Sequence, residues 1–489
     1  METKWLTYEE FGAVGDGVTD DFDAIIACHE EANKTGASVR AKDGATYYIG
    51  PTARTATIKT NTDFGTAKFT VDDRDLDDIK KHIFHIVSDH EFAPIDLAEL
   101  KKDTKRIDFP HEGRAFVVVK DDDHKTFIRR GLNCSAGVGK RDEFLVDADG
   151  SILTDINWDF DKITSAYAKS IEDEPITVKG GIFTTVANRQ ESYYNYHARG
   201  IRVLRSNVTV KDLTHYVTAE GEQGAPYGGF ITAYEVANFT MENCIMTPHL
   251  IYYTDSNIPG KKVAMGSYDI SIGSVINARL IGVIQTVNVK DGRYWGIFTS
   301  NFCKDVHFEN CVLSRFDAHM GVTNVTLKNC ILGHQCINLI GHGKAVLENC
   351  NIYGPRIADF RFDYGSLWNG SVTVKNCTLT PPADRKYIIL FTATNSGDHD
   401  FGYKCSQPHT VTIDGLKIMN GERPDAHFYV LPDFETNNYA LAEGDTVEGK
   451  PFAYQPTRKL VLKNVSFECE RELNVAVRPE LYDGMTVEK

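Results

Sequence analysis

A short phrase ending in Asn-Cys recurs along the second half of the chain and constrains its fold more than any other feature. Five copies end at residues 241–244, 308–311, 327–330, 347–350 and 374–377, and the last four cysteines are spaced by 19, 20 and 27 residues. A period near 20 residues is typical of a solenoid, in which each coil buries its apolar face only against its neighbours. The repeat therefore predicts an all-β solenoid of stacked parallel coils.

The recurrence of cysteine at one position of the coil predicts a ladder of reduced, buried thiols. Free cysteine packs as a small apolar residue, and the sequence contains no C-x-x-C pair that would favour a zinc site. We therefore expect neither disulfides nor a metal centre from the 11 cysteines.

The composition is that of an ordinary globular protein with a net charge of −15. This charge weighs against nonspecific nucleic-acid binding, which depends on surplus Lys and Arg. The N-terminus lacks the basic start and apolar core of a secretory signal, and no segment approaches the ~18 apolar residues of a membrane span. The sequence as given is thus expected to be cytoplasmic and not membrane-bound, or secreted if a leader has been trimmed from it.

The first fifty residues carry a glycine-punctuated turn that leads into a helix. Residues 11–21 read FGAVGDGVTDD, and an apolar helical face follows over residues 22–32 before Gly36. Asp20 and Asp21 are interpreted as helix-capping residues and not as metal ligands. We expect the helix to cap the open end of the solenoid, where an exposed sheet edge would invite aggregation.

This N-terminal segment resembles the pectate-lyase-3 family, a group of right-handed parallel β-helix proteins that includes family-28-like glycoside hydrolases and phage tailspikes. Residues 11–21 and the helix after them carry the resemblance, and the Asn-Cys coils extend it over the later half. The resemblance implies a right-handed parallel β-helix with a short N-terminal capping helix. Members cleave, epimerise or bind carbohydrates, so a polysaccharide or oligosaccharide is the expected partner.

The sequence pattern divides the chain into four parts. We predict a cap and first coils over residues 1–60, a β-rich insertion over 61–175, the coils that carry the site over 176–470, and a C-terminal tail over 471–489. Loops that project from coils usually gather around the binding face of a repeat protein. The site is therefore expected on the coils of the third part.

Equivalent residues of successive coils lie about 4.8 Å apart and form rows along the solenoid. Basic residues follow successive corners and are interpreted as one side of a ligand groove: His215, His249, Arg315, His334 and Arg356. Aromatic residues expected to offer flat surfaces to sugar rings are Tyr252, Tyr253, Tyr294, Trp295, Tyr364 and Trp368, with Arg293 and Arg361 as further binding residues.

The candidate catalytic centre is the segment in which Arg315, Asp317 and His319 project to one side of an extended chain. An Asp between an Arg and a His is suited to acid or base chemistry, because these neighbours tune its pKa. Gly-His-Gly at His342 is shared with family-28 polygalacturonases, where the His lies beside catalytic carboxylates, but the other motifs of those enzymes are not found at suitable positions. Further carboxylates available to the groove are Glu220, Asp359 and Asp363.

Three functions follow from these residues. The first is a glycoside hydrolase in which Asp317 is partnered by another carboxylate across the glycosidic bond. The second is a polysaccharide lyase, in which Arg or His takes the proton beside a uronate carboxylate neutralised by Arg or calcium. The third is a tailspike-like carbohydrate-binding β-helix, an interpretation that allows a homo-oligomer. No cofactor is expected beyond calcium in the case of a lyase.

Overall fold

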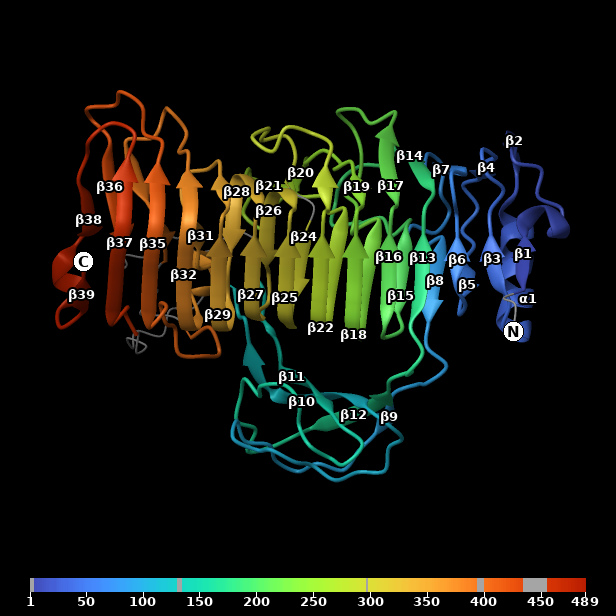
Figure 1. Ribbon diagram of the computed structural model, residues 1–489, viewed down its shortest axis with the longest axis horizontal. Coiled ribbons are helices and arrows are strands. Elements are labelled where there is room, and N and C mark those ends of the chain that lie inside the picture. The colour runs from blue at the N-terminus through green and yellow to red at the C-terminus, as the bar shows by residue number, and fades with distance from the viewer. Residues whose placement is uncertain (1–3, 130–133, 296–297, 394–399, 434–454) are drawn as a thin grey trace.

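The computed structural model describes residues 4–129, 134–295, 298–393, 400–433 and 455–489. Most of them form one long stack of parallel coils, which confirms the predicted right-handed parallel β-helix (Figure 1). The termini lie at opposite ends of the stack, and a smaller body projects from one side of it (Figure 1). Within the described ranges, no helix is long and apolar enough to cross a membrane.

Each coil crosses three faces, called faces 1, 2 and 3. Face 1 contains β1 (Trp5–Thr7), β3 (Ser38–Arg40), β6 (Thr62–Asp63), β13 (Ile176–Lys179), β16 (Val208–Lys211), β25 (Cys303–Glu309), β27 (Val322–Lys328), β29 (Gly341–Glu348) and β39 (Thr486–Glu488). Five longer strands also run through face 1 and bend into a neighbouring face: β18 (Ile231–Glu242), β22 (Ile270–Ile281), β32 (Trp368–Leu379), β35 (Thr410–Ile418) and β37 (Lys459–Phe467).

Faces 2 and 3 complete the coils. Face 2 contains β2 (Asp16–Asp20), β4 (Thr46–Ile49), β7 (Lys68–Asp72), β14 (Ile182–Val186), β17 (Thr214–Thr218), β19 (Ile245–Met246), β23 (Ile284–Gln285) and β30 (Asn351–Ile352). Face 3 contains β5 (Ala56–Ile58), β8 (Phe84–Val87), β15 (Ile201–Leu204), β24 (Phe298–Asn301), β31 (Ala358–Asp359) and β34 (Phe391–Thr392). Two strands, β26 (Val312–Ala318) and β28 (Ile331–Asn338), begin in face 2 and end in face 3.

The Asn-Cys phrases form the corner between faces 1 and 2. Asn310, Asn329 and Asn349 adopt left-handed backbone conformations with φ of 54–55°, a region that Asn tolerates better than most residues. Their side chains also form a ladder, because Asn349 donates to Asn329 and Asn329 donates to Asn310, each over 3.2 Å. Each of these asparagines therefore has two roles, since its backbone makes the turn and its side-chain amide links successive coils.

The cysteines that follow these asparagines point into the solenoid. Each is at most 2% exposed and none is in a disulfide: Cys244, Cys311, Cys330, Cys350 and Cys377. They belong to one hydrophobic core that extends from the N-terminal cap to the last coil. This placement confirms the predicted ladder of reduced thiols, in which each sulfur fills the space beneath one corner.

The predicted capping helix is α1 (Phe22–Thr35), which ends at Gly36 with φ of 72°. The carboxylate of Asp21 makes no capping bond to the helix. It accepts instead from the backbone amides of Val14 and Gly15, over 2.6 Å and 3.2 Å. Asp16 likewise accepts from the backbone amides of Val18 and Thr19, so two aspartates hold the Gly-rich turn together. The helix covers the end of the core.

The projecting body is an antiparallel sheet of β9 (Ala93–Pro94), β10 (Ala115–Thr126), β11 (Val138–Val146) and β12 (Ser165–Ser170) with a small core of its own. It begins later than the predicted boundary at residue 61, because β6, β7 and β8 pair with coil strands. The region predicted as a C-terminal tail from residue 471 also contributes strands to the stack, namely β38 (Leu473–Ala476) and β39. Short apolar strands outside the Asn-Cys rhythm explain both differences.

Buried ion pairs fasten the projecting body to the coils. Asp142 of β11 pairs with Lys304 of β25 over 2.7 Å, and both side chains are at most 2% exposed. Arg141 reaches Glu235 of β18, and its guanidinium lies 5.0 Å from the ring of Phe302. Because unpaired buried charges are costly, these pairs fix the position of the body on the solenoid.

The corner asparagines generate a stability prediction. Replacing Asn329 by Ala removes two ladder hydrogen bonds and places a Cβ-bearing residue in the left-handed region, so we expect a loss of about 2–3 kcal/mol in the free energy of unfolding. Asn329→Gly loses the same hydrogen bonds but keeps the favoured conformation, so its loss should be about 1 kcal/mol smaller. Urea unfolding of both variants measures this, and equal losses would contradict the conformational part.

Candidate functional site

A pocket of about 500 Å³ lies beside the C-terminal part of β26. Its walls come from β26, from loops of neighbouring coils and from the hairpin that joins β10 to β11 in the projecting body. The side chains used below are Arg129, Tyr268, Trp295, Arg315, Asp317, His319, Arg361 and Tyr364. The pocket thus brings together residues spread over more than two hundred positions of the chain, including all three members of the predicted 315–319 centre.

Asp317 joins two arginines at the base of the pocket. Its carboxylate pairs with Arg315 on the same strand and accepts from Nη1 of Arg361 over 2.6 Å. Arg361 in turn donates to both oxygens of Asp363, over 3.0 Å and 2.8 Å. The side chains of Arg315 and Asp317 are at most 4% exposed, so solvent screens these pairs weakly.

A third arginine adds charge to this group. Arg129, from the hairpin of the projecting body, binds Oδ2 of Asp363 over 2.7 Å. Arg129, Arg315 and Arg361 carry three positive charges against the two carboxylates of Asp317 and Asp363. The group of five side chains therefore has one positive charge left over.

Aromatic rings form the walls around these charges. The guanidinium of Arg315 lies 4.5 Å from the ring centre of Trp295, and that of Arg361 lies 5.3 Å from the ring of Tyr364. Tyr268 stacks beside Trp295 at 6.3 Å between ring centres. Cation–π contacts of this kind hold both the cation and the ring in place, so the pocket is preorganised before any ligand binds.

The charges of the pocket set the protonation of its members. Burial opposes ionisation of Asp317, but Arg315 and Arg361 outweigh it and lower the pKa of Asp317 to about 2. The pKa of Asp363 is likewise lowered by Arg361 and Arg129 against the effect of burial. Burial, reinforced by Arg361, lowers the pKa of His319 to about 4. Near neutral pH the pocket thus holds two ionised carboxylates and one neutral imidazole able to accept a proton.

Asp359 occupies the same row of face 3 as Asp317, two coils further along. The ladder runs from Asp317 to Asn338 and then to Asp359, so the two Cα atoms are roughly 9.6 Å apart. Asp359 pairs with Arg356, which also donates to Thr392 over 2.9 Å. Burial nevertheless raises the pKa of Asp359. Asp359 and Arg356 do not line the pocket.

Glu220, His249 and Tyr252 form a second polar cluster that does not line the pocket. One oxygen of Glu220 receives the Tyr252 hydroxyl and faces Nδ1 of His249, each over 3.0 Å. The His249 ring stacks on Tyr227 at 3.7 Å between centres. The structure thus unites three predicted site residues, but away from Asp317.

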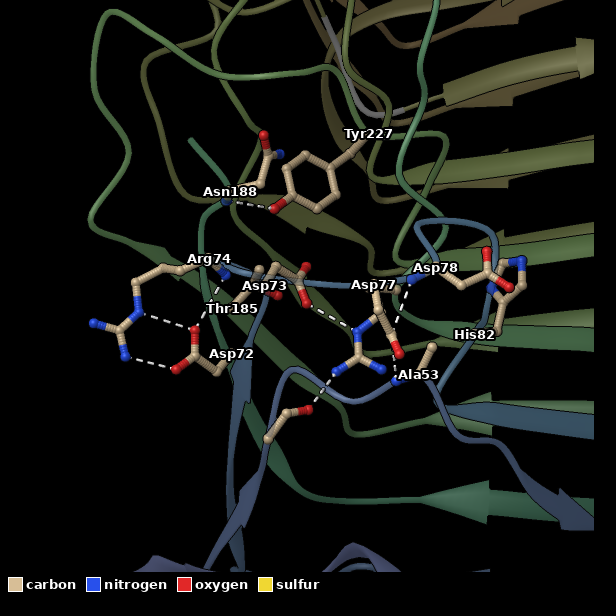
Figure 2. A network of polar contacts seen from close by, with 12 residues as sticks. Ala53, Asp72, Asp73, Arg74, Asp77, Asp78, His82, Thr185, Asn188 and Tyr227 are labelled. Carbon is tan, nitrogen blue, oxygen red and sulfur yellow. Dashed lines mark hydrogen bonds and ion pairs between the residues drawn. The ribbon is translucent and has the colours of Figure 1, made fainter. Parts of the chain in front are cut away.

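Tyr227, which stacks on His249, also bonds to Asp73 and so links the second cluster to a buried ion pair nearer the N-terminus. Asp73, which follows β7, pairs with Nε of Arg199 over 2.9 Å, and both side chains are fully buried. The hydroxyl of Tyr227 lies beside Asn188, whose backbone amide donates to it over 3.0 Å (Figure 2). These contacts join loops of successive coils, so we assign this part of the cluster to the architecture of the coils.

Three further predicted histidines, besides His249, lie outside the pocket. His215 points into the core, where it stacks on Phe230 at 3.9 Å and burial keeps its pKa well below the usual value. His334 places Nδ1 3.1 Å from the carbonyl of Val289. His342 packs edge-on against Trp158 of the projecting body at 4.7 Å. The predicted basic row is therefore broken, since His215 lies in the core and His334 at a corner, while the predicted catalytic His342 lies against the projecting body.

The remaining predicted binding residues differ in exposure. Tyr253 is 61% exposed on β20 (Tyr252–Asp255), which pairs with β21 (Lys262–Met265). Arg293 forms an exposed ion pair with Asp291 and lies over the half-buried ring of Tyr294. Trp368 is fully buried in the solenoid core. Of the predicted aromatic residues, Trp295 and Tyr364 face the pocket.

Arg129 and Tyr268 are pocket residues that the sequence reasoning did not select. Arg129 lies in the insertion, outside every coil row, and Tyr268 lies in a loop before β22. Neither position has a periodic neighbour in sequence. Arg129 can be identified only from the three-dimensional contacts that hold the hairpin against the coils.

Comparison with known proteins shows a likeness in fold. No known family profile matches the chain, and no curated protein matches its sequence. The tailspike gp61 of Pseudomonas phage phi297 is 10% identical, with a TM-score of 0.53 over 95% of this chain and 81% of the tailspike. The tailspike gp49 of Pseudomonas phage LKA1 is 13% identical, with a TM-score of 0.51 over 96% and 82%. At such identities the shared property is the right-handed parallel β-helix.

The buried position of Asp317 generates a second prediction. Asp317→Asn leaves two buried arginines without their shared carboxylate, so we expect the free energy of unfolding at pH 7 to fall by about 3 kcal/mol. The folded pKa of Asp317, about 2, lies below its ordinary value of 3.8. Its stabilisation is therefore present above pH ~4 and is lost as the pH falls towards 2.

Urea unfolding between pH 7 and pH 2 tests this assignment. The difference between the wild type and Asp317→Asn should shrink by about 2 kcal/mol over the acidic part of the range. The control is Asp108→Asn at the exposed pair with Arg106, which should change stability by less than ~0.5 kcal/mol at any pH. A difference independent of pH would contradict an ionised Asp317.

Proposed function

We propose that the pocket binds a saccharide chain and that the protein is a carbohydrate-active enzyme. One observation carries this proposal, namely a preorganised pocket in which aromatic rings flank an array of charged donors and acceptors beside Asp317. Sugar rings present apolar faces and a rim of hydroxyl groups, so aromatic walls and fixed polar groups fit them together. The finer relation to the pectate-lyase-3 family is part of the proposal and rests on the N-terminal motif.

Elimination at an acidic sugar is the reaction that the charges favour. The surplus guanidinium charge would neutralise the carboxylate of a uronate and acidify the neighbouring C–H. Neutral His319 would accept that proton, the electron pair would form a C=C bond, and the glycosidic C–O bond at the β-position would break. A tyrosine phenol is suited to protonate the leaving oxygen, and burial raises the pKa of Tyr364 to about 12, which keeps it protonated.

Hydrolysis is the second candidate, because Asp317 and Asp359 lie in one row with pKa values displaced in opposite directions. Such a pair suits an ionised base and a protonated acid. Their Cα separation of roughly 9.6 Å is near the upper end of the carboxyl separations typical of inverting glycosidases. Asp359 does not line the pocket, which ranks hydrolysis below elimination.

An activity assay on a panel of acidic and neutral polysaccharides tests the proposal. Elimination produces an unsaturated sugar, detected by its ultraviolet absorbance, and hydrolysis produces reducing ends without it. Each incubation is run with and without calcium, because calcium is the other means of neutralising a uronate carboxylate. Tight binding without either product would support the tailspike-like binding function, and neither binding nor cleavage would refute the proposal.

The role of His319 gives a third prediction. For His319→Gln we expect kcat to fall by about 10²- to 10⁴-fold with little change in substrate affinity, as typical for loss of a general base. The wild-type rate should fall as the pH drops through about 4, because the imidazole then becomes protonated. The control is His307→Gln, on the outer side of β25 next to Glu309, which should leave both properties unchanged.

A further inference from the structure

The hairpin of the projecting body is anchored beside the pocket at several points. The backbone amides of Arg129 and Ser135 donate to each other's carbonyls over 3.1 Å. These two hydrogen bonds join the two arms of the hairpin. Phe127, at φ of 54°, is buried against Tyr403, with 5.3 Å between ring centres. The amide of Ile128 donates to the carbonyl of Phe401 over 3.2 Å. Contacts with the coils therefore determine where Arg129 is placed.

Arg129 is the most exposed of the three pocket arginines. Arg361 is divided between Asp317 and Asp363, and Arg315 binds Asp317 and lies against Trp295. Arg129 shares Asp363 with Arg361 and keeps 20% of its side chain exposed. The side chains of Arg315 and Arg361 are 4% and 10% exposed. A ligand in the pocket can therefore reach the guanidinium of Arg129 more readily than the other two.

Charge counting shows what Arg129 adds. Without it, the pocket would contain Arg315 and Arg361 against Asp317 and Asp363, which is a neutral set. With it, the set carries one positive charge. A guanidinium presents several N–H groups in a fixed plane and binds oxyanions strongly.

We propose that Arg129 is the residue that selects an anionic group on the bound saccharide, so that the projecting body acts as a specificity module for the coils. The inference rests on the proposed saccharide-binding function and assigns its charge preference to one side chain. The anionic group is a carboxylate or a sulfate, which share the oxyanion chemistry that a guanidinium recognises.

The test measures binding of a polyuronate, a sulfated galactan and a neutral glucan by calorimetry, with each protein first checked for folding by thermal unfolding. Arg129→Gln should weaken binding of the matching anionic polymer by about 10- to 100-fold, the range for a lost charge-assisted hydrogen bond, and leave neutral glucan binding unchanged. Arg129→Lys keeps the charge but loses the planar fork, so its loss should be clearly smaller than that of Arg129→Gln. Arg106→Gln, which makes the same change of charge at an exposed site of the projecting body, should have no effect.

The outcomes separate the two proposals. If the wild type binds an anionic polymer and Arg129→Gln binds it equally well, the assignment of Arg129 is overturned while saccharide binding stands. Equal losses for Arg129→Gln and Arg129→Lys, or for Arg129→Gln and Arg106→Gln, would also overturn it, because the local charge would not be the cause. A wild type that binds none of the three polymers would overturn both proposals.

Discussion

The stacking of coils in register is the constraint on which the rest of this structure depends. Parallel strands offer evenly spaced hydrogen bonds but no short connection, so each coil must turn three corners before it meets its neighbour again. Asn329 shows how the chain meets this demand, since its backbone makes the turn while its side chain bonds to the coils on either side. Cys330 then fills the space beneath the corner. Local conformation and long-range pairing therefore favour the same register.

Stacking also explains how strongly opposed charges come to be buried in the pocket. Asp317 and Arg361 are 44 positions apart in sequence, yet they belong to neighbouring parts of one stack. An ionised carboxylate between two guanidiniums is stable in a poorly solvated site only if its partners are held in place. The coils hold Arg315 and Asp317, and the loop after β31 holds Arg361 and Asp363. Because the coils are rigid, they keep the paired charges in place on their flank, and the buried array is stable.

The projecting body interrupts the coils in sequence but completes their site in space. Buried pairs such as Asp142 with Lys304 attach it to the stack, and its hairpin places Arg129 beside Asp363. A solenoid flank alone is an open groove. A loop or an inserted unit can close such a groove at one point and alter its charge without disturbing the coil repeat. This division of labour accounts for a regular scaffold that carries an irregular site.

The sequence by itself determined the coil repeat, the thiol ladder, the N-terminal cap and the clustering of Arg315, Asp317 and His319, because each depends on short-range spacing. Only the tertiary structure decided which rows face outward. Leu213, just before β17, and His215 within it have the same parity and are both fully buried. In β26, a register shift between Leu313 and Arg315 reverses that alternation, so that Leu313 is in the core and Asp317 lines the pocket. The tertiary structure also decided which insertion residues reach the coils. Arg129 gains its partners through contacts that no local pattern encodes.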